Sequence, residues 1–368
     1  MQNKITYTIT TLLILSFSQC SDPVSSTDKH LEKLWELPLS EVSNSGIVIS
    51  GNSLIFKTQV NLAGQLYKVS KDGKNVQTAS IGGCTHGIPV VKDNIIYNNN
   101  CLYSLYALNE NDLSVIWSKT NFEWIPIPAV DENYVYVTDV DEVSALDKNT
   151  GSTVWTTNII GKNSVNPIVD GDVLYFATGS IFQDGYLYSI SKDSGTINYQ
   201  ITIPYIEQKS QFGGSLGGVS VWNDRVFVPG DNWIFYCFEK STGELLWSFE
   251  ADAPMEVTPS VSDSYVYFGT LNRTCYALDF YTGSLIWSYQ GGGSISSEPS
   301  FYQNYVLFKA SGALLILDKN SGKELLKMSG TTTDYGFMNA SWDADGKIYA
   351  TGYRDEDQQP MLIGFQFK

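Results

Sequence analysis

Most of the chain alternates apolar and polar positions with the period of two that is typical of half-buried β-strands. The run Leu102–Leu108 is one example, and short polar turns separate such runs along the whole sequence. Many turns resemble residues 147–151, where an Asp is followed by a Thr-Gly pair. Glycine can adopt the positive φ that a tight hairpin requires, and Asp can accept hydrogen bonds from the turn backbone. The pattern predicts short antiparallel strands throughout.

A strand–turn–strand unit that ends in an aromatic residue recurs about every 40 residues. The fullest copies are Ala145–Trp155, Cys237–Trp247 and Ala277–Trp287, and weaker copies place the equivalent of the final Trp at 35, 77, 117, 199 and 326. A repeat of this length indicates a propeller or a solenoid. The residues that define the motif are Trp35, Trp117, Ala145, Asp147, Gly151, Trp155, Gly243, Trp247, Ala277, Asp279, Gly283 and Trp287.

Two further strand-like runs precede each unit, as at Pro128–Val130 and Val135–Val137, and there are eight of each. The sequence therefore predicts an all-β, eight-bladed β-propeller of four-stranded blades. The first run, around Trp35, has no strand before it, and the last, Met361–Phe367, has no aromatic partner after it. Pairing this N-terminal outer strand with the C-terminal inner strands would close the ring and leave no long open edge. We expect one propeller domain over residues 34–368.

The Ala-x-Asp-x-x-Thr-Gly-x-x-x-Trp motif, best kept at 145–155 and 277–287, resembles that of the PQQ-like repeat family of eight-bladed propellers. The resemblance covers residues 34–367. It implies the fold, and it leaves the function open, because the family includes quinoprotein dehydrogenases as well as BamB-type envelope lipoproteins that bind no quinone. A propeller hosts many functions, so the function has to be inferred from a site.

The N-terminus is typical of a bacterial signal peptide. A basic start at Lys4 is followed by an apolar stretch, Ile5–Phe17, that is too short to span a bilayer. Cys20 then precedes a polar segment and resembles the lipid-modified residue of a bacterial lipoprotein. We expect a signal peptide over 1–19 and a lipidated, flexible tether over 20–33. The alternative is an ordinary secretory signal in which Cys20 is incidental.

Four more cysteines follow. In a propeller, Cys84 and Cys101 fall in loops on the same face, so they form either a disulfide, which an envelope location permits, or two separate buried thiols. Cys237 takes the small-residue position of its repeat, and Cys275 lies two residues before that position. We expect both in the core.

The net charge and the lack of a catalytic constellation argue against several function classes. The chain has 23 basic and 39 acidic residues, a net charge of −16, which disfavours nucleic acid and anionic bilayers as ligands. With only two histidines and no zinc-like cysteine spacing, no metal site is predicted. Ser215 lies in a G-x-S-x-G sequence, but without the strand–turn–helix context of a hydrolase. We predict no catalytic residue and no enzyme activity.

Four longer loops on one side are candidates for recognition, because loops on rigid scaffolds often carry function. They are 120–124, 203–212, 231–233 and 353–359. The alternative is that their aromatic residues pack over the end of the ring. The candidate interaction residues are Trp124, Tyr205, Phe212, Trp233 and Arg354.

The favoured hypothesis is a non-catalytic, lipid-anchored scaffold, similar to BamB, that binds envelope proteins of a Gram-negative bacterium. It would be a monomer on the outer membrane, on its periplasmic or surface side, held only by its lipid. One alternative is a glycan- or ligand-binding surface lipoprotein. A less favoured one is a quinoprotein dehydrogenase with PQQ and Ca²⁺, to which Asp139, Asp141 and Asp231 would supply oxygens. We predict no cofactor.

Overall fold

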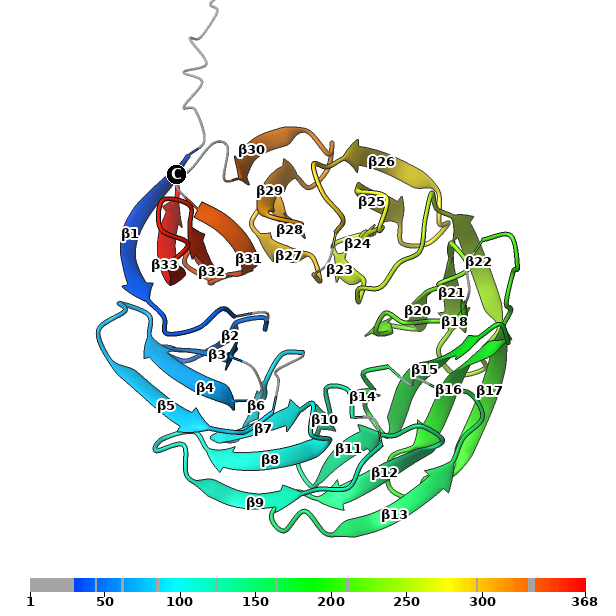
Figure 1. Ribbon diagram of the computed structural model, residues 1–368. Helices are drawn as coiled ribbons and strands as arrows, with labels where there is room; N and C mark the ends of the chain where they lie inside the picture. The colour runs from blue at the N-terminus through cyan, green and yellow to red at the C-terminus, as the bar shows by residue number, and fades with distance from the viewer. Residues whose placement is uncertain are drawn as a thin grey trace, which may run out of the picture.

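Eight antiparallel sheets surround a central axis in the computed structural model of the chain (Figure 1). The structure describes residues 30–43, 45–60, 63–83, 87–123, 125–162, 165–209, 212–295, 297–329 and 335–368. Cys20, Cys84, Trp124 and the side chain of Phe212 lie outside these residues. Within the described ranges no helix is long and apolar enough to cross a membrane. The predicted all-β, eight-bladed propeller is confirmed.

Strands of a blade follow one another outward from the axis in chain order. Blade 1 comprises β2 (Val48–Ser50), β3 (Ser53–Val60), β4 (Ala63–Ser70) and β5 (Val76–Ser80). Blade 2 comprises β6 (Val90–Lys92), β7 (Ile95–Asn100), β8 (Ser104–Asn109) and β9 (Val115–Lys119). Blade 3 comprises β10 (Ala129–Val130), β11 (Tyr134–Thr138), β12 (Glu142–Asp147) and β13 (Thr153–Asn158). Blade 4 comprises β14 (Ile168–Asp170), β15 (Val173–Ile181), β16 (Gly185–Ser191) and β17 (Ile197–Ile203), with an additional short strand, β18 (Phe212–Gly214).

The second half of the ring has the same order. Blade 5 comprises β19 (Ser220–Trp222), β20 (Arg225–Pro229), β21 (Ile234–Glu239) and β22 (Leu245–Glu250). Blade 6 comprises β23 (Ser260–Ser262), β24 (Tyr265–Gly269), β25 (Thr274–Asp279) and β26 (Leu285–Gln290). Blade 7 comprises β27 (Ser300–Tyr302), β28 (Tyr305–Ala310), β29 (Ala313–Asp318) and β30 (Glu324–Ser329). Blade 8 comprises β31 (Tyr335–Trp342), β32 (Lys347–Arg354), β33 (Pro360–Phe367) and, outermost, β1 (Leu31–Pro38).

The two ends of the chain close the ring, as the sequence predicted. β1 pairs antiparallel with β33, from Leu31 opposite Phe367 to Pro38 opposite Met361 (Figure 1). The strand begins three residues before the boundary expected at residue 34, so residues 31–33 belong to the blade and not to the tether. The reason is that pairing continues to the end of β33, where His30 and Lys368 exchange two backbone hydrogen bonds.

The repeat motif joins each blade to the next. Trp155 lies opposite the small residue Ala145 in its own blade. In the same way Trp117, the outer aromatic residue of blade 2, lies over the turn of blade 3 and donates from Nε1 to the carbonyl of Lys148 at 2.8 Å. A Cβ on Gly151 would lie 2.6 Å from this indole. The glycine therefore serves both the positive φ of the turn and the close approach of the ring.

Two blades without the Trp, blades 4 and 1, cap the same carbonyl by other means. Tyr199 replaces it in blade 4 and donates from its hydroxyl to the carbonyl of Lys240. In blade 1 the ammonium of Lys68 donates to the carbonyl of Glu110. These contacts satisfy a backbone acceptor that would otherwise be buried without a partner.

Ion pairs run in the opposite direction across five junctions. The Lys that follows the turn Asp, or its equivalent, reaches back to an Asp in the blade before it. The pairs are Lys71–Asp343, Lys148–Asp93, Lys192–Asp131, Lys240–Asp170 and Lys319–Asp263, at 2.5, 2.6, 3.3, 2.7 and 2.6 Å. At the junction of blades 5 and 6, Phe280 takes the place of the Lys and lies 5.1 Å from the guanidinium of Arg225 in blade 5.

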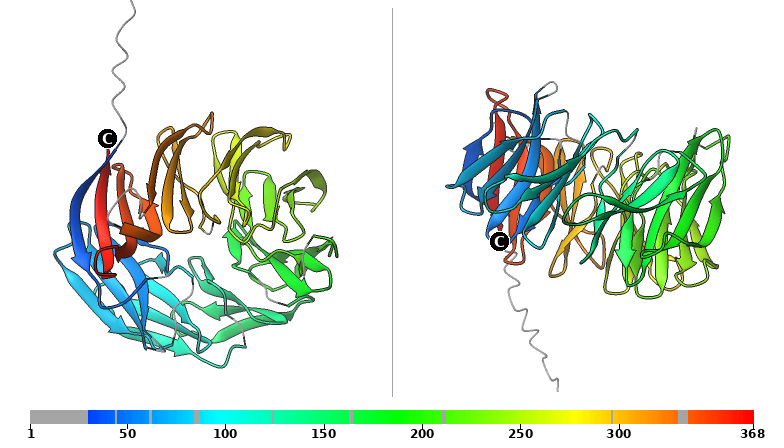
Figure 2. Two further views of the ribbon diagram at one scale, coloured as in Figure 1. Left: turned by 45° about the horizontal axis from the view of Figure 1, so that its top comes forward. Right: turned by 90° about the horizontal axis from the view of Figure 1, so that it is seen from below.

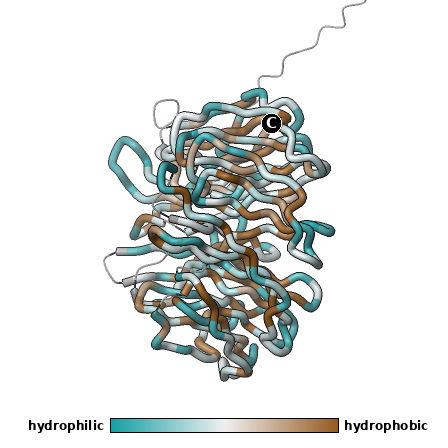
Figure 3. The backbone as a smooth tube through the Cα atoms, turned by 90° about the vertical axis from the view of Figure 1, so that its right-hand side faces the viewer, coloured by the Kyte–Doolittle hydropathy of each residue, from teal (hydrophilic) through white to brown (hydrophobic). Residues whose placement is uncertain are grey.

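Apolar side chains fill the spaces between neighbouring blades. Between blades 3 and 4, for example, Tyr136 and Val143 pack with Leu174 and Phe176. Apolar segments follow the strands and hydrophilic ones gather at the turns (Figure 3). Among the described residues, each of the eight interfaces between neighbouring blades has its own apolar cluster.

The alternating strand directions give the ring two distinct faces, seen edge-on in Figure 2. The turns between second and third strands, and the connections between blades, lie on one face, here called the loop face. The other turns lie on the opposite face, here called the turn face, together with His30 and Lys368. The described chain thus starts and ends on the turn face.

Candidate functional site on the loop face

The described parts of the four loops predicted from the sequence lie on the loop face. Residues 120–123 belong to the connection between blades 2 and 3, and residues 204–209 to the connection between blades 4 and 5. The other two, 231–233 and 353–359, are the turns between second and third strands in blades 5 and 8.

Two of the candidate aromatic residues belong to one cluster. Asn232 Nδ2 donates to the carbonyl of Pro204 at 2.8 Å, which brings the turn holding Trp233 against the loop holding Tyr205. The Tyr205 ring meets the ring of Phe182 edge-on, with centroids 6.1 Å apart. Tyr205 and Trp233 are both half-buried, so they pack over the ring as well as facing solvent.

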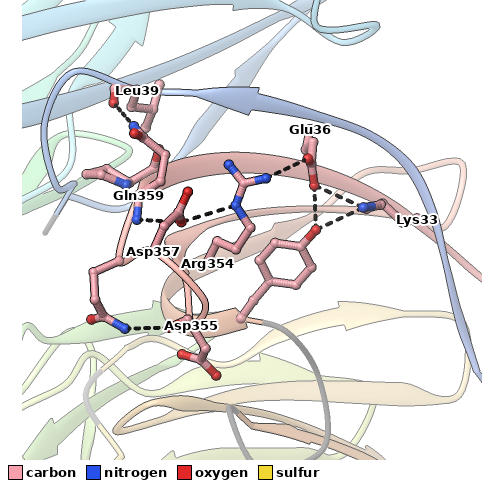
Figure 4. Close-up of polar contacts among 10 residues, drawn as sticks. Lys33, Glu36, Leu39, Arg354, Asp355, Asp357 and Gln359 are labelled. Carbon is pink, nitrogen blue, oxygen red and sulfur yellow. Dashed lines mark hydrogen bonds and ion pairs between the residues drawn. The ribbon is translucent and has the colours of Figure 1, made fainter.

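Arg354 lies in blade 8, on the far side of the ring from this cluster (Figures 1 and 4). Its Nη1 is 3.6 Å from Glu36 of β1, and its Nε is 3.2 Å from Asp357. Glu36 also accepts hydrogen bonds from Tyr335 and from Lys33, and the Tyr335 hydroxyl, followed by Lys33, lowers the pKa of its carboxyl. Arg354 therefore joins the closing strand to its blade, which favours a structural role over a binding one.

Exposed apolar side chains that the sequence did not predict mark another part of the loop face. Among the described residues, the large hydrophobic side chains exposed on this face are confined to blades 2–4 and the connection between blades 3 and 4. They are Leu102, Tyr103, Ile160, Ile181 and Phe182, with exposed fractions of 54, 44, 61, 54 and 61%. The sequence does contain a signal for these residues, because they are apolar at turn positions that are polar in other blades.

Blade 4 is built outward at this point. β15 extends to Ile181, and β18 pairs with its end, from Gly179 opposite Gly214 to Ile181 opposite Phe212. A Cβ on Gly214 would lie 1.9 Å from the carbonyl oxygen of Thr178, so the close contact requires glycine. The Gly-rich sequence before Ser215 is thus a packing feature, and the buried Ser215 hydroxyl is within 2.6 Å of the Pro229 carbonyl.

A cavity of about 500 Å³ opens beside the end of β15. Its lining combines apolar, aromatic and charged side chains from blade 4 and its two connections. They include Ile160, Lys162, Phe182, Asp184, Tyr186 and Tyr205. Tyr205 N donates to Asp184 Oδ1 at 2.8 Å, which ties the two walls together. We refer to it as the blade 4 cavity.

A second cavity, of about 390 Å³, lies between blades 2 and 3. We refer to it as the blade 2 cavity. Its lining is largely apolar and includes Tyr103, Ile125, Ile127, Asn99 and Asn166. Asn99 is held on both sides, since Lys57 Nζ lies 3.1 Å from its Oδ1 and its Nδ2 donates to the carbonyl of Ile125. Burial lowers the pKa of Lys57 to about 7.

An acidic turn lies in blade 3, the blade between those that carry the exposed apolar turns. Asp139 and Asp141 lie between β11 and β12, Glu142 is the first residue of β12, and Glu123 N donates to Asp139 Oδ1 at 3.1 Å. Burial, followed by the charges of Asp139 and Asp141, raises the pKa of Glu142 despite the opposite effect of Lys119. The local potential at this turn is therefore negative.

The carboxylates that were considered as quinone or calcium ligands do not converge. Asp139 and Asp141 belong to blade 3, whereas Asp231 lies in blade 5. Across the described residues, no group of three or more His, Cys, Asp or Glu side chains is placed to hold a metal ion. These residues do not fit a calcium–PQQ site.

The cysteines divide into two classes. Cys101 is disulfide-bonded, and its partner lies outside the described residues, so its pairing with Cys84 stays a prediction. Cys237 and Cys275 are free and buried. Burial raises the pKa of the Cys237 thiol to about 11, which makes it unreactive at neutral pH.

Comparisons with known proteins agree with this architecture. BamB from Moraxella catarrhalis superposes with a TM-score of 0.72 at 14% identity, over 92% of this chain and 98% of that one. Quinohemoprotein alcohol dehydrogenase from Comamonas testosteroni gives a TM-score of 0.70 at 12% identity, over 94% of this chain and 78% of the enzyme. At such identities both show the shared fold alone.

Sequence comparison gives one weak relative and one family. Tetrathionate hydrolase of Acidithiobacillus ferrooxidans is 24% identical over 187 residues, which are 45% of this chain and only 36% of that enzyme. The family model described as outer membrane protein assembly factor BamB matches residues 104–202 and 206–341, more than half of the chain. The eight blades, their repeat motif and this match together place the chain in the BamB family.

Proposed function

We propose that this protein is a non-catalytic scaffold of the Gram-negative cell envelope that takes part in outer-membrane protein assembly and is anchored to the outer membrane through a lipid on Cys20. It binds another envelope protein through the loop face at blades 2–4. The observation that carries the proposal is the confinement of exposed apolar side chains on this face to that arc, beside two cavities. Concentrated exposed apolar surface is typical of protein-binding sites. Family membership supports the assembly role.

The test is deletion of the gene followed by complementation. We expect the deletion to lower the amounts of β-barrel proteins in the outer membrane, and the wild-type gene to restore them. Phe182→Ser should restore them poorly, because an exposed aromatic residue that becomes buried in an interface often contributes about 2 kcal/mol or more to binding. Cys20→Ala should also fail if the lipid holds the protein at the membrane.

The matched control is Tyr281→Ser on the turn face, since Tyr281 and Phe182 are both 61% exposed. This variant should complement fully. Unchanged β-barrel levels in the deletion strain, or equal complementation by the two variants, would contradict the proposal.

Two further measurements test the alternative functions. A stoichiometric absorbance change of added PQQ with Ca²⁺ and dye-linked alcohol oxidation would instead establish a dehydrogenase. Specific retention on a glycan array would establish the glycan-binding alternative.

A further inference from the structure

We infer that the loop face of blades 2–4 binds an extended protein segment in which basic residues lie between apolar ones. This inference rests on the proposed function, because it names the chemistry of the partner at the same surface. It follows from three features of that surface: its continuity, the charge at its centre and the apolar sites at its two ends.

The surface is continuous from blade 2 to blade 4, and we call it the ledge. It consists of residues 102–103, 122–123, 139–142, 159–162 and 180–184, which come from three turns and the two connections between them. Each segment is hydrogen-bonded to the next. The bonds are Phe122 N to Tyr103 O (3.3 Å), Glu123 N to Asp139 Oδ1 (3.1 Å), Ile159 N to Asp141 O (2.8 Å) and Lys162 N to Ser180 Oγ (3.3 Å).

The centre of the ledge is acidic. Glu123 and Asp141 are exposed, and Asp139 and Glu142 are half-buried beside them. A segment with Lys or Arg at this position would relieve the repulsion among the carboxylates. The net charge of −16 would also favour the approach of a cationic partner. Nucleic acid is disfavoured for the same reason, since its phosphates would meet carboxylates.

The two ends of the ledge are apolar. At one end Tyr103 lines the blade 2 cavity and its neighbour Leu102 is exposed, and at the other end Phe182 lines the blade 4 cavity and its neighbour Ile181 is exposed. Each cavity is large enough to receive an apolar side chain of a partner. The acidic turn belongs to blade 3, between the blade 2 and blade 4 ends of the ledge, so a segment that follows the ledge from one end to the other passes over it. An extended conformation follows from this separation across a full blade.

The test uses the full chain and three synthetic peptides, with affinity measured by fluorescence anisotropy. The first peptide carries two lysines between two pairs of phenylalanines. The second replaces its lysines with glutamates, and the third replaces its phenylalanines with serines. We expect the first peptide to bind at low salt and the other two to bind at least about tenfold more weakly, because both its charge and its apolar groups contribute. Raising the salt concentration should weaken binding of the first peptide.

The ledge variant is Asp141→Asn/Glu142→Gln, and its matched control is Asp193→Asn/Glu244→Gln, which removes the same charges near the turn face. The ledge variant should weaken binding of the first peptide by about tenfold, and the control should leave it unchanged. Phe182→Ser should weaken it as well. Circular dichroism and thermal unfolding check that each variant is folded.

Equal binding of the lysine and glutamate peptides, equal effects of the two double variants, or no binding of any peptide would overturn the inference. The complementation test above separates this failure from failure of the proposed function. If Phe182→Ser fails to complement while the peptides do not discriminate, the docking face stands and the stated chemistry of the partner is wrong.

Discussion

The backbone carbonyl after the turn Asp is the point at which neighbouring blades are joined. It accepts a hydrogen bond from an indole in most blades, from the Tyr199 hydroxyl at Lys240 and from the Lys68 ammonium at Glu110. Three different side chains thus satisfy one requirement, the pairing of a buried acceptor. This explains why the aromatic of the repeat is replaceable while the fold is retained.

Replacing the glycine of the turn should lower the stability of the fold more than replacing the aromatic residue. Gly322 has a φ of +67°, and a Cβ there would lie 2.6 Å from the ring of Trp287. We expect Gly322→Ala to lower the free energy of unfolding by about 2–4 kcal/mol, because backbone strain and a steric clash add. Chemical denaturation would measure the change.

Gly312 provides a control that separates the two effects. Its φ is +74°, but a Cβ there would meet no atom within 4 Å. Gly312→Ala should therefore lower the free energy of unfolding by only about 1–2 kcal/mol, the contribution of the backbone. Equal losses in the two variants would show that contact with the indole is unimportant.

The sequence predicted these residue positions well because the same positions recur in every copy of the repeat. Each copy supplies a second observation of the same small residue, turn and aromatic, so the equivalents of Trp155 were assigned correctly even at Gln77 and Leu326, which pair like the others. The candidate site has no such redundancy. Phe182 and Leu102 have no apolar equivalents in the same turn of the other blades, and only the structure shows that their side chains are exposed.

At the level of elements, β1 completes a blade whose other strands come from the opposite end of the chain. Side-chain contacts add to the backbone hydrogen bonds of this strand, since Glu36 interacts with Lys33, Tyr335 and Arg354 (Figure 4). The closing strand is thus secured by side chains from β1, β31 and β32.

Glu36→Gln should lower the free energy of unfolding by about 1 kcal/mol at neutral pH, because a partly buried carboxylate loses its charged partners. The pKa of Glu36 is lower in the folded protein than its ordinary value of 4.5. Its contribution is therefore present above about pH 4.5 and is lost as the pH falls through the folded-state pKa. The difference between wild type and variant should shrink in acid.

The control for this prediction is Glu32→Gln on the same strand. Glu32 pairs with Lys368 at the exposed end of β1, so the variant should unfold like the wild type. Denaturation curves measured across the acid range would decide. A difference between wild type and Glu36→Gln that does not change with pH would contradict the assignment of the stabilisation to the carboxylate.

The extension of blade 4 shows what the sequence pattern could not predict at this scale. The repeat predicts a strand before the third strand of each blade, but the pairing of β18 with the end of β15 depends on close contacts of Gly185 and Gly214 across the chain. Such contacts leave no periodic signal. The sequence therefore predicts residues 203–212 only as a loop.

At the level of the whole molecule, the described chain starts on the turn face and the ledge lies on the loop face. If Cys20 carries the lipid, the eleven residues from Cys20 to His30 span at most about 40 Å. Because the tether would leave from the turn face, we expect that face to lie toward the membrane and the ledge away from it.

This orientation predicts a difference in chemical labelling. Gln183→Cys places a thiol on the loop face and Asp193→Cys places one on the turn face, and both positions are exposed. On intact membranes a bulky maleimide should label Gln183→Cys as fast as in detergent, and Asp193→Cys more slowly than in detergent. The native Cys237 and Cys275 are buried and should contribute little signal. Equal slowing at both positions would contradict the orientation.

The junction of blades 5 and 6 has a consequence for how such a ring can evolve. At five junctions the later blade contributes the lysine of the ion pair and the earlier blade the aspartate. The blades at these junctions can therefore form the same ion pair with one another. Between blades 5 and 6 the cation is Arg225 of the earlier blade, and the later blade brings Phe280. Inserting a duplicated lysine-bearing blade there would place two cations together. We therefore expect exchange of blades to be tolerated at the five junctions with a lysine–aspartate pair, and blades 5 and 6 to be exchangeable only together.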